Sequence, residues 1–298
     1  RAAPLEVVCA LVGFRRVEVR GARLLLNGRP LLIKGVNRHE HDPFLGHAVT
    51  RAGMLRDLAT IQLLNLNAVR TSHYPNAPFW QRLADRFGLM LVDEANLESH
   101  GAGWANASLA RRPEWVDAHL QRTAALVERD KNHPSVILWS LGNEAGNGEA
   151  FHRAYRDAKA RDPTRPVQYE RAQLSPLYAE FNAAYWSQMD WDTDLIVPMY
   201  PHPEELERYA TTNGSLPLVM TEYAHAMGNS LGGFAEYWAL IRRHGALQGG
   251  FIWDFKDQGI GSRTGAGKPM WAYGGASGCT RRTRAAPARA DPRPPTPP

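Results

Sequence analysis

Two glutamates, Glu144 and Glu222, each follow a strongly apolar run in the sequence. The runs are Val136 to Leu141 and Leu218 to Met220, and a parallel strand that is buried on both faces has such a continuous apolar sequence. A carboxylate that emerges at the end of a buried strand can act as an acid, a base or a nucleophile. For one glutamate alone, a solvated strand end is the simpler explanation. Whether each glutamate is functional therefore depends on the residues at the other strand ends.

A pair of such carboxylates suits glycoside hydrolysis. One carboxyl protonates the leaving oxygen, while the other attacks the anomeric carbon of the sugar. Retention of configuration requires the two groups to be about 5 to 5.5 Å apart, and the fourth and seventh strands of a barrel can supply that separation across its mouth. Tyr200 and Trp253 would offer flat faces to the C–H surfaces of a sugar ring.

The other apolar runs also end in titratable, amide or aromatic groups. A ring of such groups around one rim is costly to desolvate and is hard to explain as packing alone. We therefore expect a functional site at the carboxyl ends of the strands. The strand-end residues are His39, His73, Glu98, His100, Asn143, Glu144, Tyr200, Glu222, Tyr223, His225 and Trp253. Histidines on predicted helices or at helix ends are expected to be structural; these are His119, His133, His152 and His244.

Glu98 and His100 place two potential metal ligands two residues apart on a predicted loop, where both can turn to one cation beside Glu144. On spacing alone, a hydrogen-bonded pair of Glu98 and His100 is the simpler interpretation. Mixed carboxylate and imidazole ligation also does not name the metal.

From residue 31 onward, apolar runs alternate with amphipathic segments, which is typical of βα units. Eight strands separated by crossovers favour an α/β fold of the (β/α)8 TIM-barrel type over an open sheet. Before them, residues 11–28 resemble strand, turn and strand, with Asn27 and Gly28 in a hairpin turn. The predicted strands are 31–36, 68–71, 90–92, 136–141, 167–169, 195–199, 218–221 and 250–253, and the predicted helices are 51–64, 78–86, 113–130, 148–160, 204–209 and 231–244.

The net charge of +5 does not indicate a nucleic-acid partner, because residues 280–298 carry five Arg and one Asp and account for most of it. That segment has six Pro and no aromatic residue, so we expect it to be disordered and without a stacking surface for bases. Cys9 and Cys279 form no disulfide framework or metal motif. No apolar run is long enough to cross a membrane, and the start of the chain lacks a signal peptide. We expect a cytoplasmic protein without a membrane or nucleic-acid partner.

Seven motifs, in order along the chain, resemble the catalytic barrel of bacterial β-galactosidases of glycoside hydrolase family 2. The resemblance covers roughly residues 11–275. The motifs are Gly35-Val-Asn-Arg-His-Glu-His41, Ala68-Val-Arg-Thr-Ser-His-Tyr-Pro-Asn76, Val92-Asp-Glu-Ala-Asn-Leu-Glu-Ser-His-Gly101, Asp130-Lys-Asn-His-Pro-Ser-Val-Ile-Leu-Trp-Ser-Leu-Gly-Asn-Glu144, Pro166-Val-Gln-Tyr-Glu170, Glu222-Tyr-Ala-His-Ala-Met-Gly-Asn-Ser-Leu-Gly-Gly-Phe234 and Gln248-Gly-Gly-Phe-Ile-Trp-Asp254.

The resemblance implies removal of terminal, non-reducing β-D-galactose from β-galactosides such as lactose, by double displacement through a galactosyl-Glu222 intermediate. A related family 2 glycosidase (a β-glucuronidase or β-mannosidase) and an inactive sugar-binding fragment are the alternatives. The implied roles are Glu222 as nucleophile, Glu144 as acid/base, His39 and His73 as stabilisers of the transition state, Asn143, Tyr200, Tyr223, His225 and Trp253 as substrate contacts, and Glu98, His100 and Glu144 as ligands of Mg2+.

The chain also departs from the family pattern. Family members are longer and carry β-sandwich domains around the barrel, so we assign residues 1–20 to the end of such a domain, 21–275 to the catalytic barrel and 276–298 to a disordered Arg/Pro-rich tail. After Gly275 the sequence no longer follows the family. We therefore expect a barrel without its last helix and without the Na+ site of the family. The full-length protein is expected to be a homo-oligomer.

Overall fold

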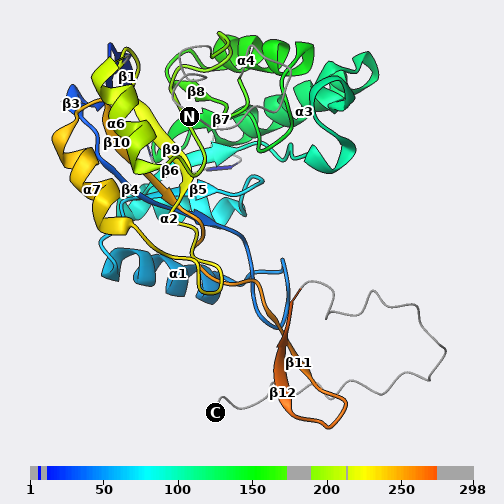
Figure 1. Ribbon diagram of the computed structural model, residues 1–298. Coiled ribbons are helices and arrows are strands. Elements are labelled where there is room, and N and C mark those ends of the chain that lie inside the picture. Colours follow the sequence, from blue (N-terminus) through cyan, green and yellow to red (C-terminus); the bar gives the residue numbers. More distant parts are fainter. Residues whose placement is uncertain (1–5, 8–11, 173–188, 213, 274–298) are drawn as a thin grey trace, which may run out of the picture.

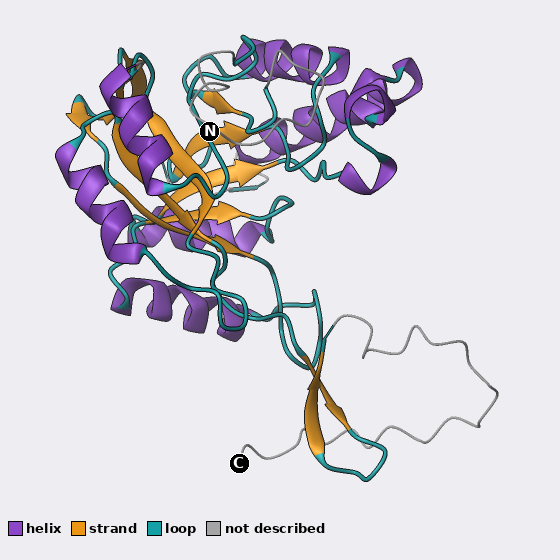
Figure 2. Cartoon of the chain, viewed as in Figure 1, coloured by secondary structure: helices purple, strands orange, loops and turns teal. Residues whose placement is uncertain are grey.

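Seven parallel strands form one curled sheet in the computed structural model, which describes residues 6–7, 12–172, 189–212 and 214–273 (Figures 1 and 2). Consecutive strands are neighbours, and β4 also pairs with β10, so the first and last strands of the series lie side by side. This order, β8-β7-β6-β5-β4-β10-β9, is that of a closed barrel. The strands are β4 (Ile33–Arg38), β5 (Ala68–Thr71), β6 (Met90–Glu94), β7 (Val136–Ser140), β8 (Val167–Gln168), β9 (Leu218–Tyr223) and β10 (Leu247–Ile252).

The eighth position of the ring is filled by residues 195–199, which were predicted as a strand but form only isolated bridges. On one side, Met199 bridges in parallel to Glu222 of β9. On the other side, the amide of Asp194 donates to the carbonyl of Val167 in β8 at 2.8 Å. The ring is therefore continuous, with seven regular strands and one irregular seam.

The helices lie outside the sheet, as the alternating pattern predicted (Figure 2). Local signals fix several of their ends: the Thr50 hydroxyl accepts from the amide of Gly53 at the start of α1, and Gly88 ends α2 in the left-handed conformation. The α-helices are α1 (Arg51–Leu63), α2 (Pro78–Phe87), α3 (Pro113–Asp130), α4 (Glu149–Arg161), α6 (Pro203–Thr212) and α7 (Phe234–Arg243), and three short 3-10 turns are η1 (His100–Ala102), η2 (Ala105–Ala107) and η3 (Leu109–Arg111).

No helix follows β10 in the part of the chain described up to Tyr273. Instead, an antiparallel hairpin, β11 (Ile260–Arg263) and β12 (Pro269–Ala272), extends away from the barrel (Figure 1). The prediction of a TIM barrel that lacks its last helix is confirmed over these residues. The predicted tail, 276–298, lies outside them. None of the described helices combines the length and apolarity needed to cross a membrane.

A small antiparallel sheet packs against one end of the barrel core. It contains β1 (Val17–Arg20), β2 (Arg23–Leu26) and β3 (Arg29–Pro30). Val17 and Leu24 belong to the same buried apolar cluster as Ile33 and Phe251 of the barrel strands. The turn between β2 and β3 has positive φ at Asn27 and Gly28, as the Asn-Gly pair predicted. The assignment of residues 1–20 to a preceding domain stays a prediction.

A second apolar layer lies between the sheet and the helices. The indoles of Trp80 on α2 and Trp139 on β7 are completely buried there, together with Ile61 of α1 and Phe151 of α4. Burial of one such side chain stabilises the fold by roughly 1.5–3 kcal/mol. This layer holds the strands in register, so that their carboxyl ends meet at one rim.

Two adjacent glycines allow β10 to approach both neighbouring strands closely. Gly249 has a φ of +94°, and a Cβ atom added to it would lie 1.9 Å from the carbonyl oxygen of Ile33 in β4. At Gly250 the added atom would lie 2.7 Å from the carbonyl oxygen of Met220 in β9. Only glycine fits at these positions without displacing a neighbouring backbone.

Gly249→Ala should therefore destabilise the barrel by roughly 2–5 kcal/mol, because it combines backbone strain with a clash against β4. The shift of the urea unfolding midpoint measures this loss. Gly101→Ala is the matched control, since a Cβ atom there meets no atom within 4 Å. Equal midpoints for the two variants would contradict this account of strand closure.

Candidate active site

The side chain of Glu222, at the end of β9, is held by hydrogen bonds to both of its oxygens. Oε1 accepts from Nη1 of Arg70 at 2.9 Å, and Oε2 accepts from the hydroxyl of Tyr200 at 2.6 Å. The Nε2 atom of His73 lies 3.9 Å from Oε1. With only 5% of the residue exposed, these contacts orient the carboxylate at the rim of the barrel.

Arg70 is the centre of a buried polar network. Its guanidinium, on β5, donates to Glu94 at 2.6 Å, to Asn37 at 2.9 Å, to Asn143 at 2.8 Å and to Glu222. Burial by itself would lower the pKa of Arg70, but the carboxylates of Glu94 and Glu222 outweigh it and raise that pKa above its usual value. Arg70 thus remains a cation that links four strand ends.

An aromatic wall lies beside this network. The rings of His73 and Trp253 are stacked with centroids 5.0 Å apart, and His39 meets both edge-on at 5.5 and 5.4 Å. The Nδ1 atom of His73 is 2.7 Å from Glu94. Burial and the neighbouring imidazole of His73 lower the pKa of His39 to about 4, so His39 is a neutral imidazole near pH 7.

Glu144 lies in a different electrostatic environment from Glu222. Its backbone has a φ of +43° and its amide donates to the carboxylate of Glu170 at 2.6 Å. Its own Oε1 accepts from Nη2 of Arg171 at 2.9 Å. Burial raises the pKa of Glu170 to about 7. The positive φ turns the backbone at Glu144 away from the direction of β7. Glu170 and Arg171, which follow β8, then hold Glu144 by hydrogen bonds.

Two further potential metal ligands, Glu98 and His100, converge beside Glu144. The Nδ1 atom of His100 lies 3.6 Å from Glu144 and 3.7 Å from Glu98, and ligand atoms of the three residues all lie within 4.8 Å of one another. Asn143 donates to Glu98 at 3.1 Å and accepts from Arg70. This donor set fits a divalent cation, because its two carboxylates balance the charge and its imidazole adds a neutral ligand.

The two glutamates belong to one rim, because Arg70 contacts both Glu222 and Asn143, the residue before Glu144. Burial and then the carboxylate of Glu222, which accepts from the Tyr200 hydroxyl, raise the pKa of Tyr200 far above its usual value, and the charge of Glu144 adds to this. The ring of His225 lies 5.9 Å from that of Tyr200. The strand-end residues that the structure brings together are therefore His39, His73, Glu98, His100, Asn143, Glu144, Tyr200, Glu222, His225 and Trp253.

Tyr223 is the predicted site residue that lies elsewhere. It is 1% exposed, its ring stacks on Phe234, and its hydroxyl accepts from the indole of Trp238 at 3.2 Å. Successive side chains of a strand point to opposite faces, so the residue after Glu222 faces α7 instead of the rim. Its position predicts a packing role.

Several residues at the centre of the site were not predicted as such from the sequence. The signal available for Arg70 was a charge within the predicted strand 68–71, where burial requires a charged partner, whereas Glu94 lies just after the predicted strand 90–92. For Glu170 and Arg171, the segment after β8 gave no regular pattern. The unpredicted residues are Asn37, Arg70, Glu94, Glu170 and Arg171.

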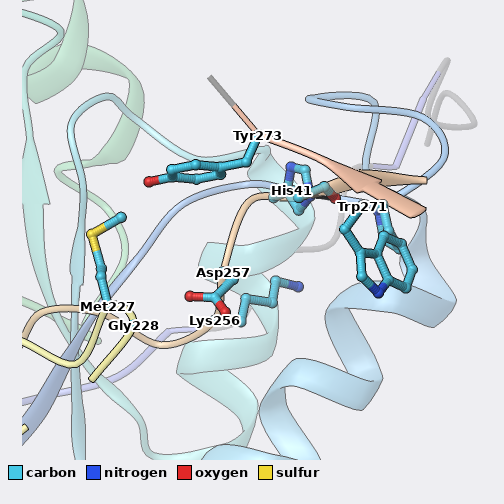
Figure 3. A pocket seen from close by; sticks show the side chains of 9 residues that line it. His41, Met227, Gly228, Lys256, Asp257, Trp271 and Tyr273 are labelled. Carbon is cyan, nitrogen blue, oxygen red and sulfur yellow. Dashed lines mark hydrogen bonds between the residues drawn. The ribbon is translucent and has the colours of Figure 1, made fainter. Parts of the chain in front are cut away.

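A cavity of about 520 Å3 lies beside the β11–β12 hairpin, which contributes Trp271 to its lining (Figure 3). The sulfur of Met227, which lines this cavity, accepts from the indole N–H of Trp253 at 3.2 Å. The cavity therefore offers space next to the polar rim. Its lining residues are His41, Pro43, Met227, Gly228, Lys256, Asp257, Gly259, Trp271 and Tyr273.

Comparison of the sequence with known protein families agrees with the barrel and with the paired carboxylates at its rim. The family described as "Glycosyl hydrolases family 2, TIM barrel domain" matches residues 17–282. The chain belongs to this family. Membership in glycosyl hydrolase family 2 confirms the resemblance seen in the seven sequence motifs, and the barrel matches the fold that it implied.

Individual relatives of this family 2 chain are bacterial β-galactosidases. The β-galactosidase of Vibrio cholerae serotype O1 is 50% identical over 295 residues, and that of Photobacterium profundum is 47% identical over 288 residues. The chain spans 27% of the length of each of these relatives.

Solved structures of β-glucuronidases share the fold. That of Ruminococcus gnavus in complex with N1-substituted uronic isofagomine has a TM-score of 0.66 at 26% identity, over 84% of this chain and 46% of that one. That of Dictyoglomus thermophilum has a TM-score of 0.68 at 23% identity, over 86% of this chain and 49% of that one. At 23% identity the second likeness concerns the fold alone.

Arg70→Leu should destabilise the protein by about 3–5 kcal/mol, because it leaves Glu94 and Glu222 buried without their cation. Arg70→Lys should also lose stability, since an ammonium cannot reproduce the four planar contacts. Urea unfolding measures both losses. Arg56→Leu on α1 removes an exposed guanidinium and serves as the control. An Arg70→Leu variant as stable as Arg56→Leu would refute the central place of this charge.

His39 should make the fold sensitive to mild acid. Its folded pKa of about 4 lies below the unfolded value of about 6.5, so the unfolded state takes up the proton first. The stability that depends on neutral His39 is complete above pH 6.5 and is lost as the pH falls towards 4. Solvent screening reduces the effect to roughly 1–3 kcal/mol.

The measurement compares urea unfolding of the wild type and His39→Asn between pH 7 and pH 4.5. The wild type should lose more stability than the variant over this range. His202→Asn, which changes an exposed histidine, should follow the wild type. Parallel curves for wild type and His39→Asn would show that His39 does not resist protonation in the fold.

Proposed function

We propose that this protein is a retaining β-galactosidase, which removes terminal non-reducing β-D-galactose from β-galactosides through a covalent galactosyl-Glu222 intermediate. The observation that carries the proposal is the presence of two rim carboxylates with different partners: Arg70 and Tyr200 hold Glu222, while Arg171 and the cation-ligand group hold Glu144. Glycosidases divide the nucleophile and acid/base roles between two such carboxylates. Relatives named as β-galactosidases at 47–50% identity support the glycone assignment.

In the first step, Glu222 attacks the anomeric carbon as Glu144 protonates the departing oxygen. In the second step, Glu144 takes a proton from water, which then displaces Glu222 from the sugar. Arg70 and Tyr200 each donate to one oxygen of the free carboxylate, and each oxygen keeps a second lone pair that can attack the anomeric carbon. Preoriented donors of this kind need no reorganisation when charge moves.

The residues around the pair have separate roles in this proposal. His39 and His73 stabilise the transition state, and Trp253 offers an aromatic face to the sugar. Asn143, Tyr200 and His225 contact its hydroxyl groups. The cavity that adjoins Trp253 gives space for the group on the other side of the scissile bond.

We further propose Glu98, His100 and Glu144 as the ligands of a Mg2+ ion, because their ligand atoms already lie together. When bound, such an ion supplies positive charge next to the acid/base carboxylate. Within the chain itself, Asn143 holds Glu98 and Arg171 holds Glu144, so the ligands are oriented by hydrogen bonds from their neighbours.

A panel of nitrophenyl glycosides tests the glycone and the roles together. The β-galactoside should be hydrolysed in preference to the β-glucuronide and β-mannoside. Glu222→Gln should lower kcat by about 10^3-fold or more, because no other group replaces the nucleophile. Glu144→Gln should lose about 10^2–10^4-fold on lactose and less on the nitrophenyl substrate, whose leaving group needs little protonation.

Glu149→Gln, an exposed glutamate at the start of α4, is the control and should keep full turnover. Wild-type rates in Glu222→Gln would exclude the proposed nucleophile. Preference for the glucuronide or mannoside would assign another family 2 activity. A cooperatively folded chain without turnover of any glycoside would instead favour the sugar-binding alternative.

A further inference from the structure

A second group of metal-ligating side chains lies outside the candidate active site. His152 belongs to α4, whereas Asp190 and Asp192 belong to the segment that leads into residues 195–199. One ligand atom from each of the three lies within 4.8 Å of the others. The fold brings these residues together from distant parts of the sequence, and the predicted structural role of His152 does not account for the whole group.

Among the three residues, Asp192 has a carboxylate whose hydrogen bonding is incomplete in the described part of the chain. The residue is fully buried, with 0% of its surface exposed. Its Oδ1 atom accepts from Nδ2 of Asn147 at 3.3 Å, but its Oδ2 atom has no hydrogen-bond partner among the residues that the structure describes. An unpaired oxygen of a buried carboxyl group is costly, and a bound cation would remove that cost.

Asp190 and His152 already face each other. The Nε2 atom of His152 lies 2.7 Å from Oδ2 of Asp190, and the same oxygen accepts from Asn147 at 3.3 Å. The amide of Asn147 therefore touches both carboxylates and can hold them as ligands in the way that outer hydrogen bonds orient metal sites. A hydrogen-bonded pair of His152 and Asp190 would explain this contact, but it would leave Oδ2 of Asp192 without a partner in the described part of the chain.

The side chains that pack over His152, Asp190 and Asp192 also favour a cation between these three residues. The ring of Trp191 packs on that of His152 at a centroid distance of 4.9 Å, which shields the imidazole from solvent. The guanidinium of Arg156 lies 4.4 Å from the centroid of Trp191 and is engaged with this ring. Two carboxylates and one neutral imidazole match the charge of a divalent ion.

We propose that His152, Asp190 and Asp192 bind a Zn2+ ion. The imidazole and the burial of Asp192 together favour zinc, because magnesium usually keeps several bound waters and so suits the more exposed group of Glu98, His100 and Glu144. Three protein ligands leave the fourth tetrahedral position for water. Asn147 lies three residues after Glu144, so the ion would tie the loop of the acid/base residue to the seam of the barrel. The proposal does not depend on glycoside hydrolysis.

Zinc counting on the purified chain tests this site. The protein is dialysed to equilibrium against buffered Zn2+ with excess Mg2+, which competes for the Glu98, His100 and Glu144 group, and bound zinc is then measured by elemental analysis. Asp192→Asn and His152→Gln should each bind one Zn2+ fewer per chain than the wild type. Zn2+ should raise the thermal unfolding midpoint of the wild type but not of these variants.

Asp157→Asn is the matched control, because it removes an aspartate from α4 whose partner is Arg161. It should bind as much zinc as the wild type. If Asp192→Asn does not fold, His152→Gln decides, since the amide keeps a hydrogen bond to Asp190 but is a weak ligand. Equal zinc counts in the wild type and His152→Gln would overturn the proposal.

Discussion

The buried guanidinium of Arg70 is the charge on which the rim of the barrel depends. It joins Asn37 of β4, Glu94 of β6, Asn143 after β7 and Glu222 of β9 through direct hydrogen bonds. A charge without water is tolerated only when partners surround it. The same contacts that make the burial of Arg70 possible also orient the side chain of Glu222. The stability of the barrel and the geometry of its site therefore depend on the same hydrogen bonds.

This network separates the surroundings of the two catalytic candidates. Glu222 lies on the side of Arg70 and Tyr200, whereas Glu144 lies on the side of Arg171 and the cation ligands. Asn143 links the two sides because its amide contacts both Arg70 and Glu98. Two carboxylates on one rim can thus differ in chemical behaviour, which a double-displacement reaction requires.

Regular elements and strand-end residues could be predicted because their signals are local. The apolar runs and Asn-Gly turn specify strands and hairpin, and the residue after each strand must lie near the rim. Tyr223 shows the limit of this reasoning, since one step along a strand reverses the side-chain direction. The contacts of Arg70 and the pairing of His152 with Asp190 depend on which elements become neighbours in space, and no local pattern encodes them.

The irregular segment at 195–199 is joined unevenly to its two neighbours. Four backbone hydrogen bonds connect residues 196–200 with residues 217–222, whereas on the side of β8 the amide of Asp194 donates to Val167. Backbone hydrogen bonds that are few and isolated break in local opening events of low free energy. Tyr200 follows this segment directly on its well-bonded side, because its amide donates to the carbonyl of Glu222 at 2.8 Å and its hydroxyl donates to the carboxylate. Local opening of the wall would therefore begin between this segment and β8, while Tyr200 stays bonded to the nucleophile candidate Glu222.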